Sequence, residues 1–318
     1  MTLPVRRLSE FELIARVTQD LPLGPGVIVG VGDDCAVVAP CVDQDWLLKT
    51  DAVVEGVHFE RGAGFERIGR KALARCLSDI AAMGGKPHAA LVTLALPDNH
   101  QIEEVEALYA GIRQLADRYG VSVVGGETTR NPERYLISIS LTGTVPKGKC
   151  ARRSGARVGD AIFVTGELGG SIEGRHLDFE PRLEEGAWLA GEFGVHAMMD
   201  LSDGLAGDLR HILQASGLGA ELLGSAIPVS RTAKLRGRGG DTAKPPLLAA
   251  LTDGEDFELV FTVSAAAAVR LVDAWKIRFP SLRLSCIGKI VEKPGLRLRD
   301  QRGIRELSAH GYVHFKES

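Results

Sequence analysis

The stretch ALARCLSDIAAMGG, residues 72–85, combines the spacing of a helix with one carboxylate in an apolar setting. It closes a longer amphipathic segment that predicts a helix from about residue 65 to 83, ended by the two glycines. Apolar side chains recur at helical spacing, and Asp79 falls within the stripe that they form. Asp79 is therefore either a boundary residue bonded to a neighbour or part of a polar site on this helix.

Outward from this helix, strands and helices alternate in two series separated by the basic connector 146–160. The first series predicts a short capped helix opening at Ser9, strands near 35–39, 45–54, 89–96, 121–124 and 135–145, and helices at 65–83 and 101–119. The second predicts strands at 161–166, 257–263 and 283–291, helices at 182–193, 203–215 and 265–278, and a surface loop at 235–246. Because the alternation of strands and helices begins again after the connector, the sequence predicts an α+β fold, with mixed helices and strands, in two domains at residues 1–148 and 149–318.

The composition is that of an ordinary globular protein. Of 318 residues, 45% are hydrophobic and 25% charged, and this composition excludes a largely disordered chain. A net charge of −3 and 5% aromatic residues do not indicate nucleic-acid binding. We expect no membrane partner, since no apolar stretch is long enough to span a bilayer and the first residues lack a signal-peptide core. Five scattered cysteines without a CxxC predict reduced thiols and a cytoplasmic location.

Acidic residues stand at the ends of apolar segments. GVGDDCAVV (30–38) places two aspartates side by side, and two such charges ~4 Å apart repel by about 4 kcal/mol at an effective dielectric near 20. A solvated turn would explain this pair, and a strand-end turn or a helix cap would explain any other single acid. Together they are harder to explain in this way, because buried carboxylates are rarely left unpaired. Clustered carboxylates with a threonine hydroxyl suit Mg²⁺, so we predict a magnesium site from these acids: Asp34, Asp51, Asp79, Glu127, Asp200 and Asp203.

Phosphate-binding features accompany the acids, although the familiar signatures are missing. The sequence has no P-loop, no GxGxxG opening a helix after a strand, no HExxH and no GxSxG. Gly125-Gly126 and Gly169-Gly170-Ser171 offer backbone N–H groups, and Arg152-Arg153 offers cations. Each of the glycine pairs is also compatible with a plain turn.

At this point the motifs resemble those of the thiamine-monophosphate kinase family, within the superfamily of aminoimidazole ribonucleotide synthetase and selenophosphate synthetase. The resemblance runs from about residue 10 to 315 through these strings: GVGDDCAVV, KTDAVVEGVHF, ALARCLSDIAAMG, GGETTR, RSGARVGD, FVTGELGGS, DLSDGL and GEDFEL. It implies ATP- and Mg²⁺-dependent phosphorylation of thiamine monophosphate to thiamine diphosphate by direct in-line transfer, without a covalent nucleophile. It also implies a two-domain synthetase-like fold and a homodimer whose N-terminal halves pair into a β-barrel beside the active site.

Carried over by position, the resemblance assigns roles to individual residues. Several Mg²⁺ ions would be held by Asp34, Thr50, Asp51, Asp79, Glu127, Asp200 and Asp203. ATP would contact Gly125, Gly126, Arg153 and Ser202. Thiamine monophosphate would face His58, Glu255 and Tyr312.

Two positions depart from the family pattern. Glu127 stands where the family usually has aspartate, and Lys49 stands where it often has serine or threonine. Two alternatives to the kinase remain at this stage. The first is another ATP-dependent enzyme of the superfamily, such as an aminoimidazole ribonucleotide synthetase, and the second is a metal-stabilised dimer without catalytic activity.

Overall fold

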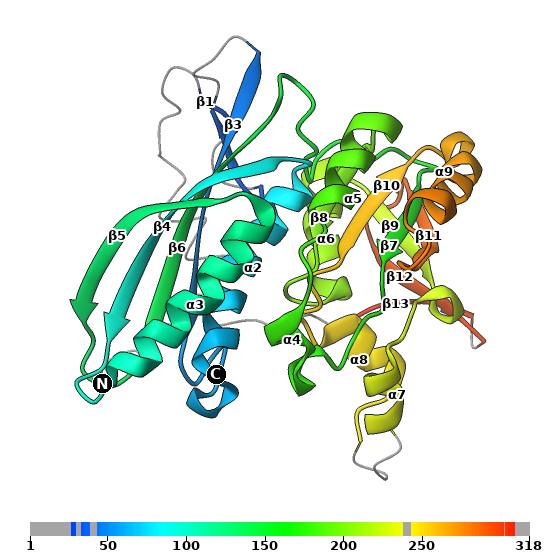
Figure 1. Cartoon of the computed structure of the whole chain (residues 1–318). Helices are drawn as coiled ribbons and strands as arrows, with labels where there is room; N and C mark the ends of the chain where they lie inside the picture. Colours follow the sequence, from blue (N-terminus) through cyan, green and yellow to red (C-terminus); the bar gives the residue numbers. More distant parts are fainter. Residues whose placement is uncertain (1–26, 30–32, 39–42, 238–242, 302, 309–318) are drawn as a thin grey trace, which may run out of the picture.

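The computed structural model describes residues 27–29, 33–38, 43–237, 243–301 and 303–308. These residues form two β-sheets, each with its own helices, and the helix α2 (Phe65–Ala82) lies between them (Figure 1). The helix expected near Ser9 lies outside the described residues, as do Cys41, Tyr312 and part of the loop expected at 235–246. The four other cysteines are free thiols, as expected. Within the described part of the chain, we find no helix with the length and apolarity needed to cross a bilayer.

The first sheet has six strands in the order β1-β2-β3-β6-β4-β5. Its neighbours pair antiparallel except β4 and β5, which are parallel because the helix α3 connects them. The strands and second helix of this half are β1 (Val27–Val29), β2 (Ala36–Val38), β3 (Gln44–Val54), β4 (Lys86–Leu96), α3 (Ile102–Tyr119), β5 (Ser122–Arg130) and β6 (Leu136–Pro146).

The second sheet has seven strands in the order β13-β12-β9-β11-β7-β10-β8. Its strands are β7 (Ala161–Thr165), β8 (Ala197–Asp200), β9 (Gly219–Leu223), β10 (Leu259–Val263), β11 (Leu284–Val291), β12 (Gly295–Asp300) and β13 (Gly303–Glu306). Its helices are α4 (Arg175–Asp178), α5 (Leu183–Trp188), α6 (Leu205–Ser216), α7 (Arg231–Arg236), α8 (Pro246–Thr252) and α9 (Ala265–Arg278). A π-helical turn, Leu189–Phe193, follows α5 where the sequence predicts one continuous helix.

The two faces of the first sheet differ. In β3, Leu47 and Val53 are buried on the face that α2 and α3 cover, because alternate side chains point to opposite sides of a strand. Leu48 and Thr50 point to the other face and are exposed. In the described part of the chain, no helix covers that face of β4, β5 and β6 (Figure 1). Side chains at odd positions of β3 near residue 50 therefore face α2, and those at even positions face the open side.

The strand β5 corrects one expectation. Gly125 and Gly126 lie inside β5 rather than in a turn, and this strand continues through the GGETTR motif to Arg130. A Cβ added at Gly126 would lie 1.8 Å from the carbonyl oxygen of Val92 in β4. Glycine is required here because the two backbones approach closely at an irregularity of the β4–β5 pairing.

Glycines also set the position of α2. A Cβ added at Gly111 of α3 would lie 1.8 Å from the Glu66 carbonyl oxygen of α2, and one at Gly186 of α5 would lie 2.0 Å from the Ala81 carbonyl oxygen. The helix backbones are therefore in contact at both places. α2 packs in this way against a helix of each half of the molecule.

Gly111→Ala should lower the free energy of unfolding by about 1–3 kcal/mol, since the added methyl group overpacks the α2–α3 contact. In an unconstrained helix, the same change would stabilise by up to about 1 kcal/mol. The check is the thermal or urea midpoint, with Gly191→Ala as the control, because a Cβ at Gly191 meets no atom within 4 Å. A midpoint unchanged or raised in Gly111→Ala would contradict the close contact.

Candidate active site

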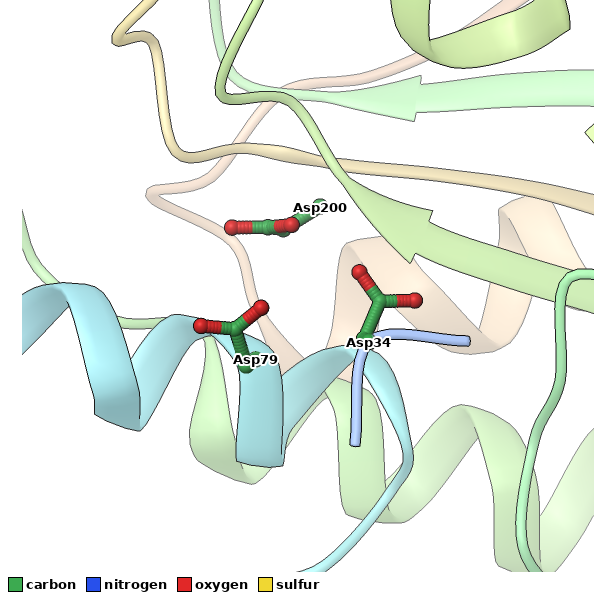
Figure 2. Close-up of side chains that lie close together, drawn as sticks. All are labelled: Asp34, Asp79 and Asp200. Carbon is green, nitrogen blue, oxygen red and sulfur yellow. The ribbon is translucent and has the colours of Figure 1, made fainter. Parts of the chain in front are cut away.

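Three aspartates from distant parts of the sequence meet between the two sheets. Asp34 precedes β2, Asp79 lies on α2 and Asp200 ends β8, and Figure 2 shows their carboxylates turned toward one another. One carboxylate oxygen of each lies within 4.8 Å of those of the other two. All three residues are buried. We call Asp34, Asp79 and Asp200 the aspartate cluster.

The aspartate cluster is electrostatically crowded. Burial, followed by the charge of Asp34, raises the pKa of Asp200 to about 7. Burial also raises the pKa of Asp79 well above the ordinary carboxyl value, even though Lys49 acts in the opposite direction. Asp33 lies beside the cluster, and burial together with Asp34 raises its pKa to about 6. Removing these carboxylates from water without enough positive charge disfavours their ionised forms.

Side chains of the protein already contact each member of the aspartate cluster. Lys49 Nζ lies 2.9 Å from Asp79 Oδ1. Arg153, from the connector between the sheets, donates hydrogen bonds of 3.1 and 3.0 Å to the two carboxylate oxygens of Asp34. Ser78 donates a hydrogen bond of 2.6 Å to Asp200. Burial would lower the pKa of Lys49, but Asp79 and then Asp51 outweigh it, so the pKa is raised and the ammonium is held charged.

A row of charged residues along α2 connects the two halves. Lys71, Arg75 and Asp79 follow one another at intervals of four residues and therefore share one helix face. Arg75 donates a hydrogen bond of 2.9 Å to Asp51 in β3, and its other end lies 3.4 Å from Glu255 in the second half. The row thus binds acids of both halves at once.

Lys71 is fully buried at the end of this row. Its ammonium donates 2.6 Å to the His58 carbonyl oxygen and 2.8 Å to Glu255, and it lies 2.8 Å from His176 Nδ1 of α4. Burial lowers the pKa of Lys71 to about 8. Burial would raise the pKa of Glu255, but the hydrogen bond from His176 and the charge of Lys71 lower it to about 2. Glu255 is therefore a carboxylate at neutral pH.

The backbone around Glu255 adopts an uncommon conformation. Glu255 and Phe257 have φ angles of 54° and 51°, in the left-handed region that non-glycine residues rarely occupy. The Glu255 N–H donates 2.6 Å to the Ser202 carbonyl oxygen, and the Phe257 N–H donates 2.8 Å to that of Leu201. These bonds fix GEDFEL against DLSDG and place Glu255 beside Ser202 and Asp203. Backbone strain of this kind is often found at binding sites.

A cavity of about 90 Å³ lies where these segments meet. Arg75 and three acidic side chains give it a charged lining, and two apolar side chains, Val57 and Ile172, complete it. Both halves contribute, because Val57, His58 and Arg75 precede the connector and the others follow it. The lining residues are Val57, His58, Arg75, Ile172, Ser202, Asp203, Asp253 and Glu255.

The structure brings most of the predicted site residues to this junction. Asp34, Asp79 and Asp200 form the cluster, Arg153 binds Asp34, and Asp51 lies on the α2 side of β3, bonded to Arg75. His58, Ser202, Asp203 and Glu255 line the cavity. The Asp203 N–H donates 3.0 Å to Asp208. Tyr312 lies outside the described residues.

Thr50 and Glu127 do not join the aspartate cluster within one chain. The Thr50 hydroxyl lies on the open face of the sheet, where the Ser140 hydroxyl donates to it at 3.2 Å. Glu127 is exposed on β5 and pairs with Thr93, which pairs with Ser138, which pairs with Ala52 in β3. Three strand spacings of about 4.8 Å place Glu127 roughly 14 Å across the sheet from Ala52. Their assignment as metal ligands stays a prediction, as do the ATP contacts of Gly125 and Gly126 on the same strand.

The second glycine turn has partners within the protein. The Gly169 N–H donates to Asp256 at 2.9 Å, and the Gly170 N–H donates to Asp253 at 2.9 Å. These amides bind carboxylates of the GEDFEL segment and of the residue before it. Their interpretation as phosphate donors is therefore replaced by a structural role.

Sequence reasoning missed several members of the site. Lys71 and Arg75 could have been found from their four-residue spacing to Asp79, which places them on the same face of the helix. Asp208 is fully buried near Asp203. Like Asp79 on α2, it lies within the apolar stripe of its helix, here formed by Leu205, Leu209 and Ile212 of α6, and this pattern could have indicated it. No local pattern indicates His176, which reaches Lys71 only through the tertiary fold.

Both halves of the chain match known protein families. Residues 32–145 match the family described as AIR synthase related protein, N-terminal domain, and residues 157–301 match the corresponding C-terminal domain. A thiamine-monophosphate kinase of Rhodopirellula baltica is 40% identical over 300 residues, covering 91% of this chain and 92% of that protein. The chain belongs to the thiamine-monophosphate kinase family. The thiamine-monophosphate kinase of Escherichia coli K12 is 35% identical over 333 residues, covering 96% and 98% of the two chains.

Solved structures agree with this family membership. A structure described as AaThiL complexed with AMPPCP and TMP has a TM-score of 0.83 and 32% identity, and the match covers 99% of this chain and 100% of that one. The hydrogenase maturation protein HypE of E. coli has a TM-score of 0.69 at 22% identity, covering 86% and 87% of the two chains, and shares the fold alone. The two-domain AIR synthase-like architecture of the thiamine-monophosphate kinase family is thus the architecture of this chain.

Lys71→Met should destabilise the protein by about 2–3 kcal/mol, because it leaves the Glu255 carboxylate with fewer partners in a largely buried place. The double variant Lys71→Met/Glu255→Gln should recover part of this loss, since it also removes the unpaired charge. Urea unfolding of the wild type, both single variants and the double variant measures the coupling. Additive effects of the two changes would show that the Lys71–Glu255 contact contributes nothing to stability.

Proposed function

We propose that this chain transfers the γ-phosphoryl group of ATP to the phosphate of thiamine monophosphate, giving thiamine diphosphate and ADP. The observation that carries the proposal is the buried aspartate cluster beside a cavity whose lining joins both halves. Family membership supports it, as does the related structure described as a complex with AMPPCP and TMP. A phosphate oxygen of thiamine monophosphate would form the new bond to the γ-phosphorus, and the bond from that phosphorus to ADP would break.

Magnesium fits the residues of the site. The cluster offers carboxylate oxygens alone, which suit a hard divalent cation. Burial, together with the neighbouring carboxylates, raises the pKa values of Asp79 and Asp200, and a bound cation would favour their ionised forms. Asp34, Asp79 and Asp200 would hold Mg²⁺, with Asp51 and Asp203 nearby as further ligands. When bound, the ions neutralise charge on the phosphates of ATP.

The side chains of the protein position the two phosphorylated substrates. Arg153 is anchored at Asp34, at the edge of the cluster, where its guanidinium can pair with a phosphate oxygen of ATP. Ser202 lies beside the cavity and can donate a hydrogen bond to the same nucleotide. Ser78 is buried, donates its hydroxyl proton to Asp200 and does not line the cavity, so it anchors a cluster aspartate rather than facing a substrate, which agrees with direct transfer between the substrates.

The cavity suits a cationic substrate. Thiamine carries a permanent positive charge on its thiazolium ring, and Glu255 adds a carboxylate to the lining, with Lys71 and Arg75 as its partners within the protein. Asp203 and Asp253 add to the acidic lining, and Val57 and Ile172 offer apolar contact to a ring. Glu255 and His58 would therefore face the thiamine, and Tyr312 is assigned the same role from the family pattern.

We also propose that the chain forms a homodimer through the open face of the first sheet. Leu48 on β3, Leu91 on β4 and Val124 on β5 have exposed fractions of 42%, 48% and 64%. All three line an open groove of about 420 Å³. β5 is the edge strand of this sheet in the described part of the chain, and exposed apolar side chains beside an edge strand are typical of a protein interface. A second copy packed on this face would form the predicted barrel and cover Thr50 and Glu127. From the sequence we further propose a domain boundary near residue 148 and a cytoplasmic location.

The assay that tests the function is ADP release on mixing the protein with ATP, Mg²⁺ and thiamine monophosphate. The precursor of aminoimidazole ribonucleotide serves as the competing substrate. ADP formed with the precursor and none with thiamine monophosphate would identify a synthetase instead. No ADP with either substrate would indicate a non-catalytic member of the family.

Asp79→Asn should fold and lose phosphoryl transfer by about a hundredfold or more, since several kcal/mol of charge stabilisation disappear with the carboxylate. The amide fills the same volume and its oxygen can still accept a hydrogen bond from Lys49, which Asp51 also holds charged, so the fold should be kept with some loss of stability. Initial rates at saturating Mg²⁺ measure the effect, with circular dichroism as the check on folding. Asp178→Asn, an exposed acid that pairs with Arg67, is the matched control. Near-normal turnover in Asp79→Asn would make Asp79 a structural residue.

Leu91→Glu should convert the dimer into a monomer, because it places a charge in the centre of the proposed interface. Sedimentation equilibrium measures the mass. Ile277→Glu is the control, since Ile277 is 84% exposed on α9 in the other half. A wild-type monomer, or an intact Leu91→Glu dimer, would contradict the interface.

A further inference from the structure

Lys49 occupies a position in β3 where an apolar residue would be expected. Its side chain points to the α2 side of the sheet, the same side as the buried Leu47 and Val53. Only 21% of the side chain is exposed. A lysine is rarely placed so far from water unless an acid holds it there.

The acid that holds it is a member of the aspartate cluster. Lys49 Nζ lies 2.9 Å from Asp79 Oδ1, and this is the ion pair that the described residues provide for Asp79. The neighbouring carboxylates have other partners. Asp34 is bound by Arg153, Asp51 by Arg75, and Asp200 by the Ser78 hydroxyl.

An ammonium and a divalent ion compete for the same place. A carboxylate oxygen binds Mg²⁺ at about 2.1 Å, so an ion that approached this Asp79 oxygen from the Lys49 side would lie within the space that the ammonium fills. The two cations would also repel each other at such a distance. One covalently attached positive charge therefore stands where a free ion could otherwise bind.

We propose that Lys49 is a built-in cation of the aspartate cluster, and that its ammonium neutralises Asp79 in place of one divalent metal ion. The chain then binds one divalent ion fewer than it would with a neutral hydroxyl residue at position 49. This inference rests on the metal site of the proposed function, but it concerns the number of ions and not the reaction.

The experiment counts bound Mn²⁺ in the full chain by electron paramagnetic resonance, with a non-hydrolysable ATP analogue and without thiamine monophosphate. Lys49→Thr should bind one more Mn²⁺ per chain than the wild type. Its melting temperature without metal should be lower than that of the wild type, and the rise on adding Mn²⁺ should be larger. Lys49→Arg keeps the charge and should keep the wild-type count. Lys289→Thr, an exposed lysine in β11, is the matched control.

A double variant keeps the test decisive if Lys49→Thr folds poorly without metal. Lys49→Thr/Asp79→Asn removes the cation and its acid together, so it should fold, and its Mn²⁺ count should not exceed that of the wild type. Equal Mn²⁺ counts in the wild type and Lys49→Thr would overturn the inference and leave the proposed kinase activity untouched. Absence of Mn²⁺ binding in both proteins would overturn the metal site itself, which the ADP assay tests separately.

Discussion

The charged row on α2 is the contact on which the arrangement of the molecule depends. Lys71, Arg75 and Asp79 share one face of a helix whose other faces are packed in a hydrophobic core. That row faces the second half of the chain, where Glu255 and Asp200 lie. Removing such charges from water is costly unless each finds a partner. The two halves are therefore brought together in the one arrangement that satisfies the row.

The same arrangement leaves the acids in excess. The cations and hydroxyl near the cluster pair with Asp34, Asp51, Asp79 and Asp200, yet the pKa values of Asp79 and Asp200 remain raised. Pairing alone does not offset the burial of these carboxylates and their repulsion of one another. Further positive charge bound at the aspartate cluster would therefore stabilise the junction.

Much of the fold follows from local patterns in the sequence. The helix expected at 265–278 is found with those bounds, and that expected at 65–83 ends one residue earlier. Periodicity succeeds there because amphipathic helices pack on one face. It fails at β5, where Gly125 and Gly126 suggest a turn, because the contact with Val92 that requires glycine is between strands distant in sequence.

The site was predicted less completely, for a physical reason. Asp79 stands out because a carboxylate in an apolar stripe is visible locally. Thr50 and Asp51 look alike as neighbours in sequence, but the strand sends their side chains to opposite faces. Partners such as His176 and Arg153 depend on how the two sheets meet, and no short stretch records that. The fixed position of α2 also has a mechanical consequence. Because a Cβ at Gly186 of α5 would lie 2.0 Å from the Ala81 carbonyl oxygen of α2, a hinge motion that separated the two halves would have to break this close contact between helix backbones.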